Sequence, residues 1–291
     1  MMASTTTMET KTLEVPGATL TYDVRKGHGT SAEPPLFLIG YPMAAGGFPT
    51  LASHFTDRTV VTYDPRGFER SVRAADAPIN TPDIVADDVH AIIEALGQGP
   101  VDMFASSGGA ITSLALVARH PNDVRRLVAH EPPLTAVLPD RAEAEAAVKD
   151  LVDTYQSRGH GHAMAKFMAL VMYQGEFPTD WAARPAPDPA MFGMPGDDDG
   201  KRDDQMMAPM AITTGYQPEF AAIKAAPTRV TIAAGEDEKG TMANRAAHGV
   251  AARLGSPVAE FPGGHGGFLG GEYGQMGKPD EFAAKLREVL S

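Results

Sequence analysis

A serine flanked by small residues separates an apolar run from a helix-like segment. Residues 101–105 are apolar apart from one aspartate, Ser106 and Ser107 follow, and two glycines lead into the apolar stretch 110–119. A sharp strand-to-helix turn of this kind strains the central serine and lifts its hydroxyl towards the helix N-terminus, where N–H groups can stabilise an oxyanion. The spacing therefore predicts Ser107 as a nucleophile, with Ser106 at a variable position. The alternative is a glycine-containing turn without chemistry.

A late histidine could activate this serine, since a hydroxyl is a weak nucleophile without a base. His265 lies in the glycine-rich loop Gly263-Gly264-His265-Gly266-Gly267, directly after the apolar run 258–261. A lone histidine is more often a surface residue of a flexible loop. The position of His265 in the chain favours a catalytic role, because nucleophile, acid and then histidine is one of the known chain orders of a catalytic triad.

Short apolar runs alternate with helix-period segments along the chain, which is typical of a parallel sheet with helices on its faces. Thr81, Pro82 and Gly97 bound a predicted helix over 83–96 as N-cap, first helical residue and C-terminal stop. Residues 13–15 and 19–24 flank Pro16-Gly17 and predict a hairpin. Further strands are predicted at 36–39, 59–63, 101–105, 127–129, 229–234 and 258–261, and a last helix at 280–290.

The stretch between the strands at 127–129 and 229–234 has a different character. It is rich in methionine, contains the single tryptophan, Trp181, and includes the charged stretch 197–204. We interpret residues 133–228 as an inserted, mainly helical cap. Residues 1–132 and 229–291 then form the core.

Two further segments make a family resemblance specific. Ile39-Gly40-Tyr41-Pro42-Met43 resembles the His-Gly-x-Pro oxyanion loop of the α/β-hydrolase superfamily, and residues 63–71 resemble its Asp-x-Arg-Gly-x-Gly-x-Ser segment. With the serine turn and the late histidine, the resemblance covers nearly all of the chain outside the predicted cap. It implies a mostly parallel eight-stranded sheet flanked by helices, with backbone N–H groups of Tyr41 and Gly108 as the oxyanion donors.

The chain departs from the family pattern at four places. Ile39, Ala105 and Glu69 replace a histidine and two glycines, and none of these changes removes a reacting group. The fourth concerns the acid, which in the family usually follows the penultimate strand, where this chain has Glu238. A second family arrangement places the acid one strand earlier, at Glu131. We favour Glu131 because two prolines follow it and a rigid element preorganises a carboxylate better, but Glu238 stays open.

Composition narrows the classes of partner. The formal net charge of −12 argues against nucleic acid and anionic membranes, and the absence of cysteine excludes disulfides and thiol nucleophiles. The N-terminus lacks the pattern of a secretory signal, and no apolar stretch reaches membrane-spanning length. We expect a soluble, cytoplasmic monomer or homodimer. His160 and His162 hint at a metal but lack a carboxylate at helical spacing, so neither metal nor cofactor is expected.

The favoured hypothesis is hydrolysis of an ester, lactone or similar acyl bond in a small hydrophobic molecule through an acyl-enzyme. Ser107 as nucleophile argues against epoxide hydrolases and haloalkane dehalogenases, which use a carboxylate. The same site could instead serve a C–C bond hydrolase, a cofactor-free haloperoxidase or a lyase. A ligand-binding homologue that has lost activity is a third possibility, because fold does not determine function.

Overall fold

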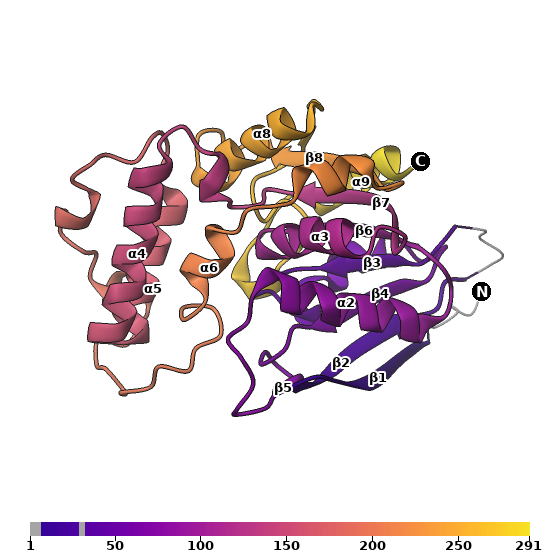
Figure 1. Ribbon diagram of the computed structural model, residues 1–291, viewed down its shortest axis with the longest axis horizontal. Helices are drawn as coiled ribbons and strands as arrows, with labels where there is room; N and C mark the ends of the chain where they lie inside the picture. Colours follow the sequence, from indigo (N-terminus) through magenta and orange to yellow (C-terminus); the bar gives the residue numbers. More distant parts are fainter. Residues whose placement is uncertain (1–6, 29–32) are drawn as a thin grey trace.

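The computed structural model describes residues 7–28 and 33–291. Its centre is a single sheet (Figure 1), whose main path runs in the order β1-β2-β4-β3-β6-β7-β8-β9. The strands of this path are β1 (Met8–Val15), β2 (Ala18–Arg25), β4 (Val60–Asp64), β3 (Leu36–Ile39), β6 (Val101–Ser106), β7 (Val124–His130), β8 (Arg229–Gly235) and β9 (Val258–Phe261). A ninth, two-residue strand, β5 (Val72–Arg73), pairs with β2. Along this path, each pair of neighbouring strands from β4 through β3, β6, β7 and β8 to β9 is parallel, while β2 is antiparallel to β1 and β4. The predicted, mostly parallel sheet flanked by helices is confirmed, with β5 as a ninth strand beyond the eight expected.

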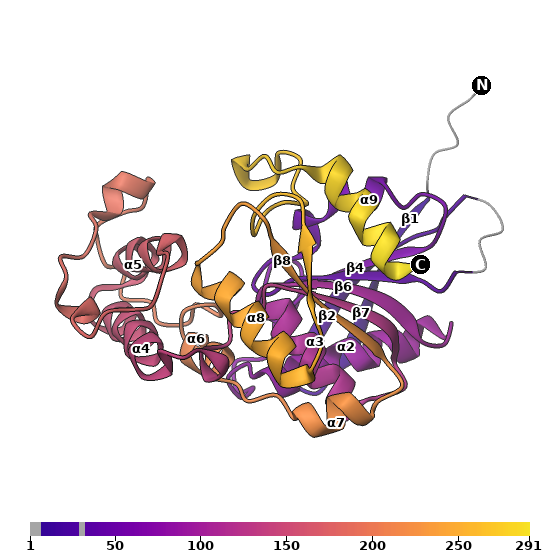
Figure 2. The ribbon, with the colours of Figure 1, turned by 90° about the horizontal axis from the view of Figure 1, so that it is seen from above.

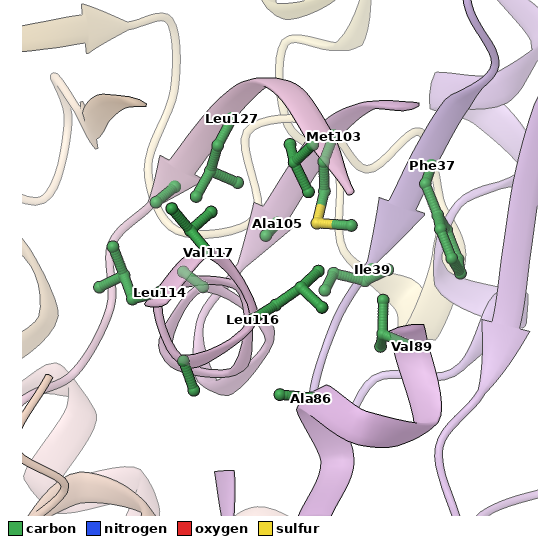
Figure 3. Packing of buried hydrophobic residues seen from close by; sticks show 14 of the residues in the cluster. Phe37, Ile39, Ala86, Val89, Met103, Ala105, Leu114, Leu116, Val117 and Leu127 are labelled. Carbon is green, nitrogen blue, oxygen red and sulfur yellow. The ribbon is translucent and has the colours of Figure 1, made fainter. Parts of the chain in front are cut away.

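Helices cover both faces of this sheet (Figure 2). One face carries α2 (Pro82–Leu96), α3 (Gly108–Arg119), α7 (Phe220–Ala225) and α8 (Met242–Leu254), and the other carries α1 (Pro49–Ser53) and α9 (Pro279–Leu290). Successive side chains of a strand point to opposite faces, so the central strands feed two separate cores. Met103 and Ala105 of β6 pack with Leu116 of α3 in the first core (Figure 3). Phe104 packs with Phe282 of α9 in the second.

Local signals account for several element boundaries. The Thr81 hydroxyl accepts a hydrogen bond from the amide of Ile84, Pro82 begins α2, and Gly97 ends it in the left-handed region. Such a side-chain cap satisfies an N–H group that would otherwise lack a partner. The hairpin around Pro16-Gly17 forms with Val15 opposite Ala18. These predictions from sequence are confirmed.

The segment between β7 and β8 contains two helices that lie side by side and stand clear of the sheet (Figures 1 and 2). They are α4 (Arg141–Arg158) and α5 (His160–Met172). Leu151 and Tyr155 of α4 pack with Ala163 of α5 and with Met207 in a small cluster separate from the two cores of the sheet. After α6 (Met210–Thr214) the chain returns to the core through α7, whose Ile223 joins the main cluster. Single-turn 3-10 helices occur at Ala45–Gly47, Thr135–Val137, Trp181–Ala183, Pro189–Phe192 and Glu272–Gly274. Within residues 7–28 and 33–291, the helices are too short or too polar to cross a membrane.

Candidate active site

Ser107 forms a strained elbow between β6 and α3. Its φ is 58° and its ψ is −129°, a conformation that costs energy for any residue with a Cβ. Strain of this kind persists only where the surrounding structure enforces it. Here the Ser107 amide donates a hydrogen bond of 3.0 Å to the carbonyl of His130 at the end of β7, and α3 begins at the next residue. The predicted strand-serine-helix turn is therefore formed and anchored on the neighbouring strand.

The loop after β3 lies directly against the first turn of α3. A Cβ added at Gly108 would come within 2.6 Å of the carbonyl oxygen of Tyr41, and one at Gly109 within 2.8 Å of the Cα of Gly40. Only glycine permits so close an approach between two backbones. The two residues predicted as oxyanion donors, Tyr41 and Gly108, are thus neighbours beside the N-terminus of a 12-residue helix, where the helix dipole favours negative charge.

The Tyr41 side chain connects this loop to the segment between β7 and β8. Its hydroxyl donates a hydrogen bond of 2.9 Å to the backbone carbonyl of Gln205 and accepts one of 3.3 Å from the Asn80 amide. Burial raises the pKa of Tyr41 to about 12, so the hydroxyl stays protonated and remains a donor. The segment between β7 and β8 is therefore tied to the loop that carries the Tyr41 amide.

His265 is paired with Glu131. The histidine Nδ1 lies 2.7 Å from Oε2 of the glutamate, the length of a strong charge-assisted hydrogen bond. Glu131 follows β7 with a φ of 49° and has no exposed side-chain surface, while the His265 side chain is 38 % exposed. The other carboxylate oxygen, Oε1, accepts hydrogen bonds from the amide of Gly235 at 2.9 Å and from Asn244 at 3.3 Å. Three donors therefore hold the carboxylate rigidly.

The two members of this pair shift each other's pKa. Burial alone raises the pKa of Glu131, but the hydrogen bond from His265 and the two nearby imidazoles outweigh it, so the net pKa is lowered. Burial alone lowers the pKa of His265, but the hydrogen bond and charge of Glu131 outweigh it, so its pKa is raised. Glu131 is consequently ionised at neutral pH, and it makes the imidazole a better base.

Glu238 occupies a different position. A Cβ on Gly264 would come within 2.3 Å of its Oε1, so the carboxylate lies against the backbone beside His265. It lines a polar pocket of about 210 Å³ together with Asp237 and Lys278. Its charge helps to raise the pKa of His265, but the hydrogen bond of Nδ1 goes to Glu131. Of the two carboxylates predicted from sequence, the structure brings only Glu131 into hydrogen-bonding contact with the histidine.

Within residues 7–28 and 33–291, two groups of side chains have the residue types and spacing of a metal site. His130, Glu131 and His265 bring one ligand atom each within 4.8 Å of one another, as do His90, His120 and Asp123. The 2.7 Å between the Glu131 and His265 atoms is shorter than the roughly 3.3 Å that separates two ligands held about 2.0–2.1 Å from one tetrahedral zinc ion. This distance fits a shared proton better than an ion.

The second group fits a metal ion no better. The His90 and His120 rings are stacked with their centroids 3.8 Å apart and 9° between their planes, so their lone pairs lie in two separate, nearly parallel planes and do not converge on one point. On α5, Nδ1 of His160 lies 3.1 Å from a carboxylate oxygen of Asp204, an ion-pair distance. His162 lies 3.3 Å from the guanidinium of Arg158.

Two residues at the site are not singled out by sequence reasoning. Asn244, near the start of α8, donates to Glu131 and to the carbonyl of Gly235, yet it is 113 residues from that glutamate and carries no local motif. His130 precedes Glu131 and is fully buried beside His265, with ring centroids 6.0 Å apart. The signal in the sequence that could have marked it is a histidine directly after the apolar run 127–129.

Comparison with known proteins agrees with this architecture. The chain is 28% identical over 289 residues to an uncharacterized hydrolase, YraK, of Bacillus subtilis, covering 98% of this chain and 97% of that protein. A 71-residue stretch is 41% identical to 2-hydroxymuconate semialdehyde hydrolase of Pseudomonas sp. strain CF600, covering 24% and 25% of the two chains. The enol-lactonase of Burkholderia xenovorans LB400 superposes with a TM-score of 0.65 at 18% identity, over 96% of this chain and 99% of that one. Residues 35–185, just over half of the sequence, match the family described as alpha/beta hydrolase fold, and the chain belongs to that family.

Proposed function

We propose that this hydrolase cleaves an ester, lactone or similar acyl bond of a small hydrophobic molecule through an acyl-enzyme. Ser107 is the nucleophile, His265 the general base and Glu131 the acid of the triad. The observation that supports this most is the 2.7 Å pair of His265 and the buried Glu131, next to a strained serine elbow on the neighbouring strand. A base oriented by a third group is the arrangement that activates a hydroxyl nucleophile.

The first half of the reaction forms the acyl-enzyme. His265 removes the proton from the Ser107 hydroxyl as its oxygen attacks the carbonyl carbon, and the amides of Tyr41 and Gly108 stabilise the negative oxygen of the tetrahedral intermediate. The intermediate collapses, and His265 returns the proton to the departing alcohol. In the second half His265 deprotonates a water that attacks the acyl carbon, and it returns this proton to the Ser107 oxygen as the acyl–oxygen bond breaks and the acid leaves. Glu131 stays ionised throughout and stabilises the imidazolium.

Glu131 is the better candidate for the acid than Glu238. It is buried and held by the Gly235 amide and the Asn244 side chain, so its orientation is set before the substrate arrives. Glu238 is partly exposed beside a polar pocket and contacts no hydrogen-bonding atom of His265. Its role in the proposal is limited to adding negative charge near the base.

We further propose that residues 133–228 act as a cap that shapes the substrate site, on a core of residues 1–132 and 229–291. Support comes from α4 and α5, which stand clear of the sheet, and from the hydrogen bond between the Tyr41 hydroxyl and Gln205. Met206 and Met210 lie in the same stretch as Gln205, and methionine adapts to apolar ligands of irregular shape. A small hydrophobic substrate fits this composition.

A second candidate is hydrolysis of a carbon–carbon bond. It is favoured by the 41% identity over 71 residues to 2-hydroxymuconate semialdehyde hydrolase. The two candidates can be separated with the purified protein by comparing turnover of p-nitrophenyl acetate with turnover of 2-hydroxymuconate semialdehyde. If the protein cleaves 2-hydroxymuconate semialdehyde efficiently and the ester slowly, C–C hydrolysis becomes the proposed activity in place of acyl hydrolysis, with the same serine and histidine.

Fluorophosphonate labelling tests the nucleophile directly. The reagent is expected to form one adduct, and fragmentation mass spectrometry must place it on Ser107 and not on the adjacent Ser106. Ser107→Ala should abolish both labelling and ester turnover, whereas Ser53→Ala, at a serine whose hydroxyl only caps its own short helix, should leave both unchanged. An adduct at another residue, or an active Ser107→Ala protein, would refute the proposal.

A further inference from the structure

His130 is a polar ring in a place built for an apolar one. It ends β7, has no exposed surface, and lies among four phenylalanine rings with centroid separations of 5.4–6.4 Å, from Phe104, Phe261, Phe268 and Phe282. Its Nε2 is buried and, within the part of the chain that the structure describes, has no hydrogen-bond partner. Burying an unpaired polar atom is unfavourable, so packing alone favours phenylalanine here. The imidazole needs another explanation.

Among the described residues, the one hydrogen bond of the His130 ring goes to Ser106, the residue before the proposed nucleophile. Its Nδ1 lies 3.3 Å from the hydroxyl of Ser106, and both groups are buried. Ser106 ends β6 as His130 ends β7, and the two residues are opposite each other in the parallel ladder. The residues that follow them, Ser107 and Glu131, are the proposed nucleophile and acid. This side-chain contact therefore joins the last residues of β6 and β7, the two strands that carry the proposed nucleophile and acid.

Both following residues have an unfavourable backbone conformation. Ser107 has a φ of 58° and Glu131 a φ of 49°, and neither is a glycine. The backbone provides one bond across the junction, from the Ser107 amide to the His130 carbonyl. Two adjacent strained turns need further restraint if their side chains are to keep a fixed separation. A buried bond between Ser106 and His130 supplies that restraint from the side chains.

We propose that Ser106 and His130 are positioning residues that hold the nucleophile in reach of the Glu131–His265 pair. The inference rests on the proposed function of Ser107, Glu131 and His265. Neither residue touches the reacting atoms, and the pair acts by fixing the ends of β6 and β7 relative to each other. The His130 ring also lies next to the proposed general base, since the centroids of the His130 and His265 rings are 6.0 Å apart with 30° between their planes.

Substitutions at His130 can separate its two nitrogens. Asparagine places a polar atom near the position of Nδ1, glutamine places one near Nε2, and phenylalanine fills the aromatic cage with no polar atom. If the bond to Ser106 is what matters, His130→Asn should keep most of the activity, while His130→Gln and His130→Phe should not. Ser106→Ala should resemble His130→Phe. Ser113→Ala is the matched control, because this buried hydroxyl on α3 bonds only within its own helix.

The measurement is steady-state hydrolysis of p-nitrophenyl acetate. A misplacement of less than about 1 Å can cost up to a hundredfold in rate, so Ser106→Ala and His130→Phe should each lower kcat by roughly ten- to a hundredfold with little change in KM. The double variant should be no slower than the slower single one, because both changes break the same bond. Circular dichroism melting curves verify that each variant is folded, and Ser106→Ala removes only a hydroxyl.

Several results would overturn the inference. Additive losses of kcat in the double variant would show that the two residues act separately. Equal losses in folded His130→Asn and His130→Phe would show that the bond to Ser106 does not matter. A variant with a lowered thermal midpoint but unchanged kcat would assign the pair to ordinary packing. Wild-type kcat in Ser106→Ala, beside an inactive Ser107→Ala protein, would refute the positioning role and leave the proposed function intact. Activity retained in Ser107→Ala would instead refute the proposed function itself.

Discussion

Replacing Glu131 by glutamine tests the proposed triad at the point where the geometry makes the sharpest prediction. The carboxylate Oε1 accepts hydrogen bonds from the Gly235 amide and from Asn244, so a glutamine must keep its oxygen there. Its NH₂ group then faces Nδ1 of His265, where the wild-type carboxylate oxygen lies 2.7 Å away. Since an NH₂ group only donates, Nδ1 must become the acceptor, and the ring proton moves to Nε2. That tautomer cannot take a proton from Ser107.

The expected loss is large. A neutral amide in place of the triad carboxylate costs about 10⁴ in kcat in a serine protease through the same change of tautomer, which corresponds to about 5.4 kcal/mol at 1.36 kcal/mol per tenfold change. We expect a fall of about 10³–10⁴ in kcat for p-nitrophenyl acetate with Glu131→Gln. Glu238→Gln is the control, with an expected change of less than about threefold, because that carboxylate acts on His265 only through its charge.

The pH profile gives an independent readout of the same change. The proposed mechanism requires neutral His265, so kcat/KM should fall as the pH drops through the histidine pKa, which Glu131 raises above its ordinary value. Removing the charge of Glu131 should move this fall to lower pH as well as lower the plateau. Near-normal turnover by Glu131→Gln, or a large loss confined to Glu238→Gln, would refute the assignment of the acid.

Three further predictions concern the surroundings of the triad. Tyr41→Phe removes the hydroxyl that bonds to Gln205 and should raise KM by about fivefold with kcat nearly unchanged, as one lost hydrogen bond of about 1 kcal/mol implies, measured by steady-state kinetics. Gly108→Ala places a Cβ 2.6 Å from the Tyr41 carbonyl and should lower kcat by about a hundredfold in a protein that circular dichroism shows to be folded. Burial lowers the pKa of His130 to about 4, so as the pH falls the unfolded chain binds a proton at this residue before the folded protein does. Folding stability should therefore decline as the pH falls from about 6.5 to about 4. The thermal midpoint of His130→Phe should decline less over that range, and an equal decline would contradict this origin.

Much of the scaffold follows from local signals. The α2 boundaries follow from Thr81 and Gly97, and the serine elbow follows from small residues between a strand and an apolar helix, because caps and turns depend on neighbours in the chain. The family resemblance implies that the Tyr41 and Gly108 amides are the oxyanion donors, and the structure brings the two backbones close together. Interactions within a few residues are sufficient for the helix boundaries and the elbow, whereas the Tyr41–Gly108 contact joins segments far apart in the sequence and was expected only from the family resemblance.

The surroundings of the histidine depend on contacts that no local pattern contains. The loop after β9 brings His265 past β8 to Glu131 at the end of β7, 134 residues away in sequence, although Glu238 lies closer along the chain. Asn244 reaches the same carboxylate from α8. Which carboxylate meets the imidazole depends on strand order and on the path of a glycine-rich loop, and both are set by packing between distant segments. The sequence alone therefore determined the scaffold and the two candidate acids, and only the tertiary structure decided which of them is bonded to His265.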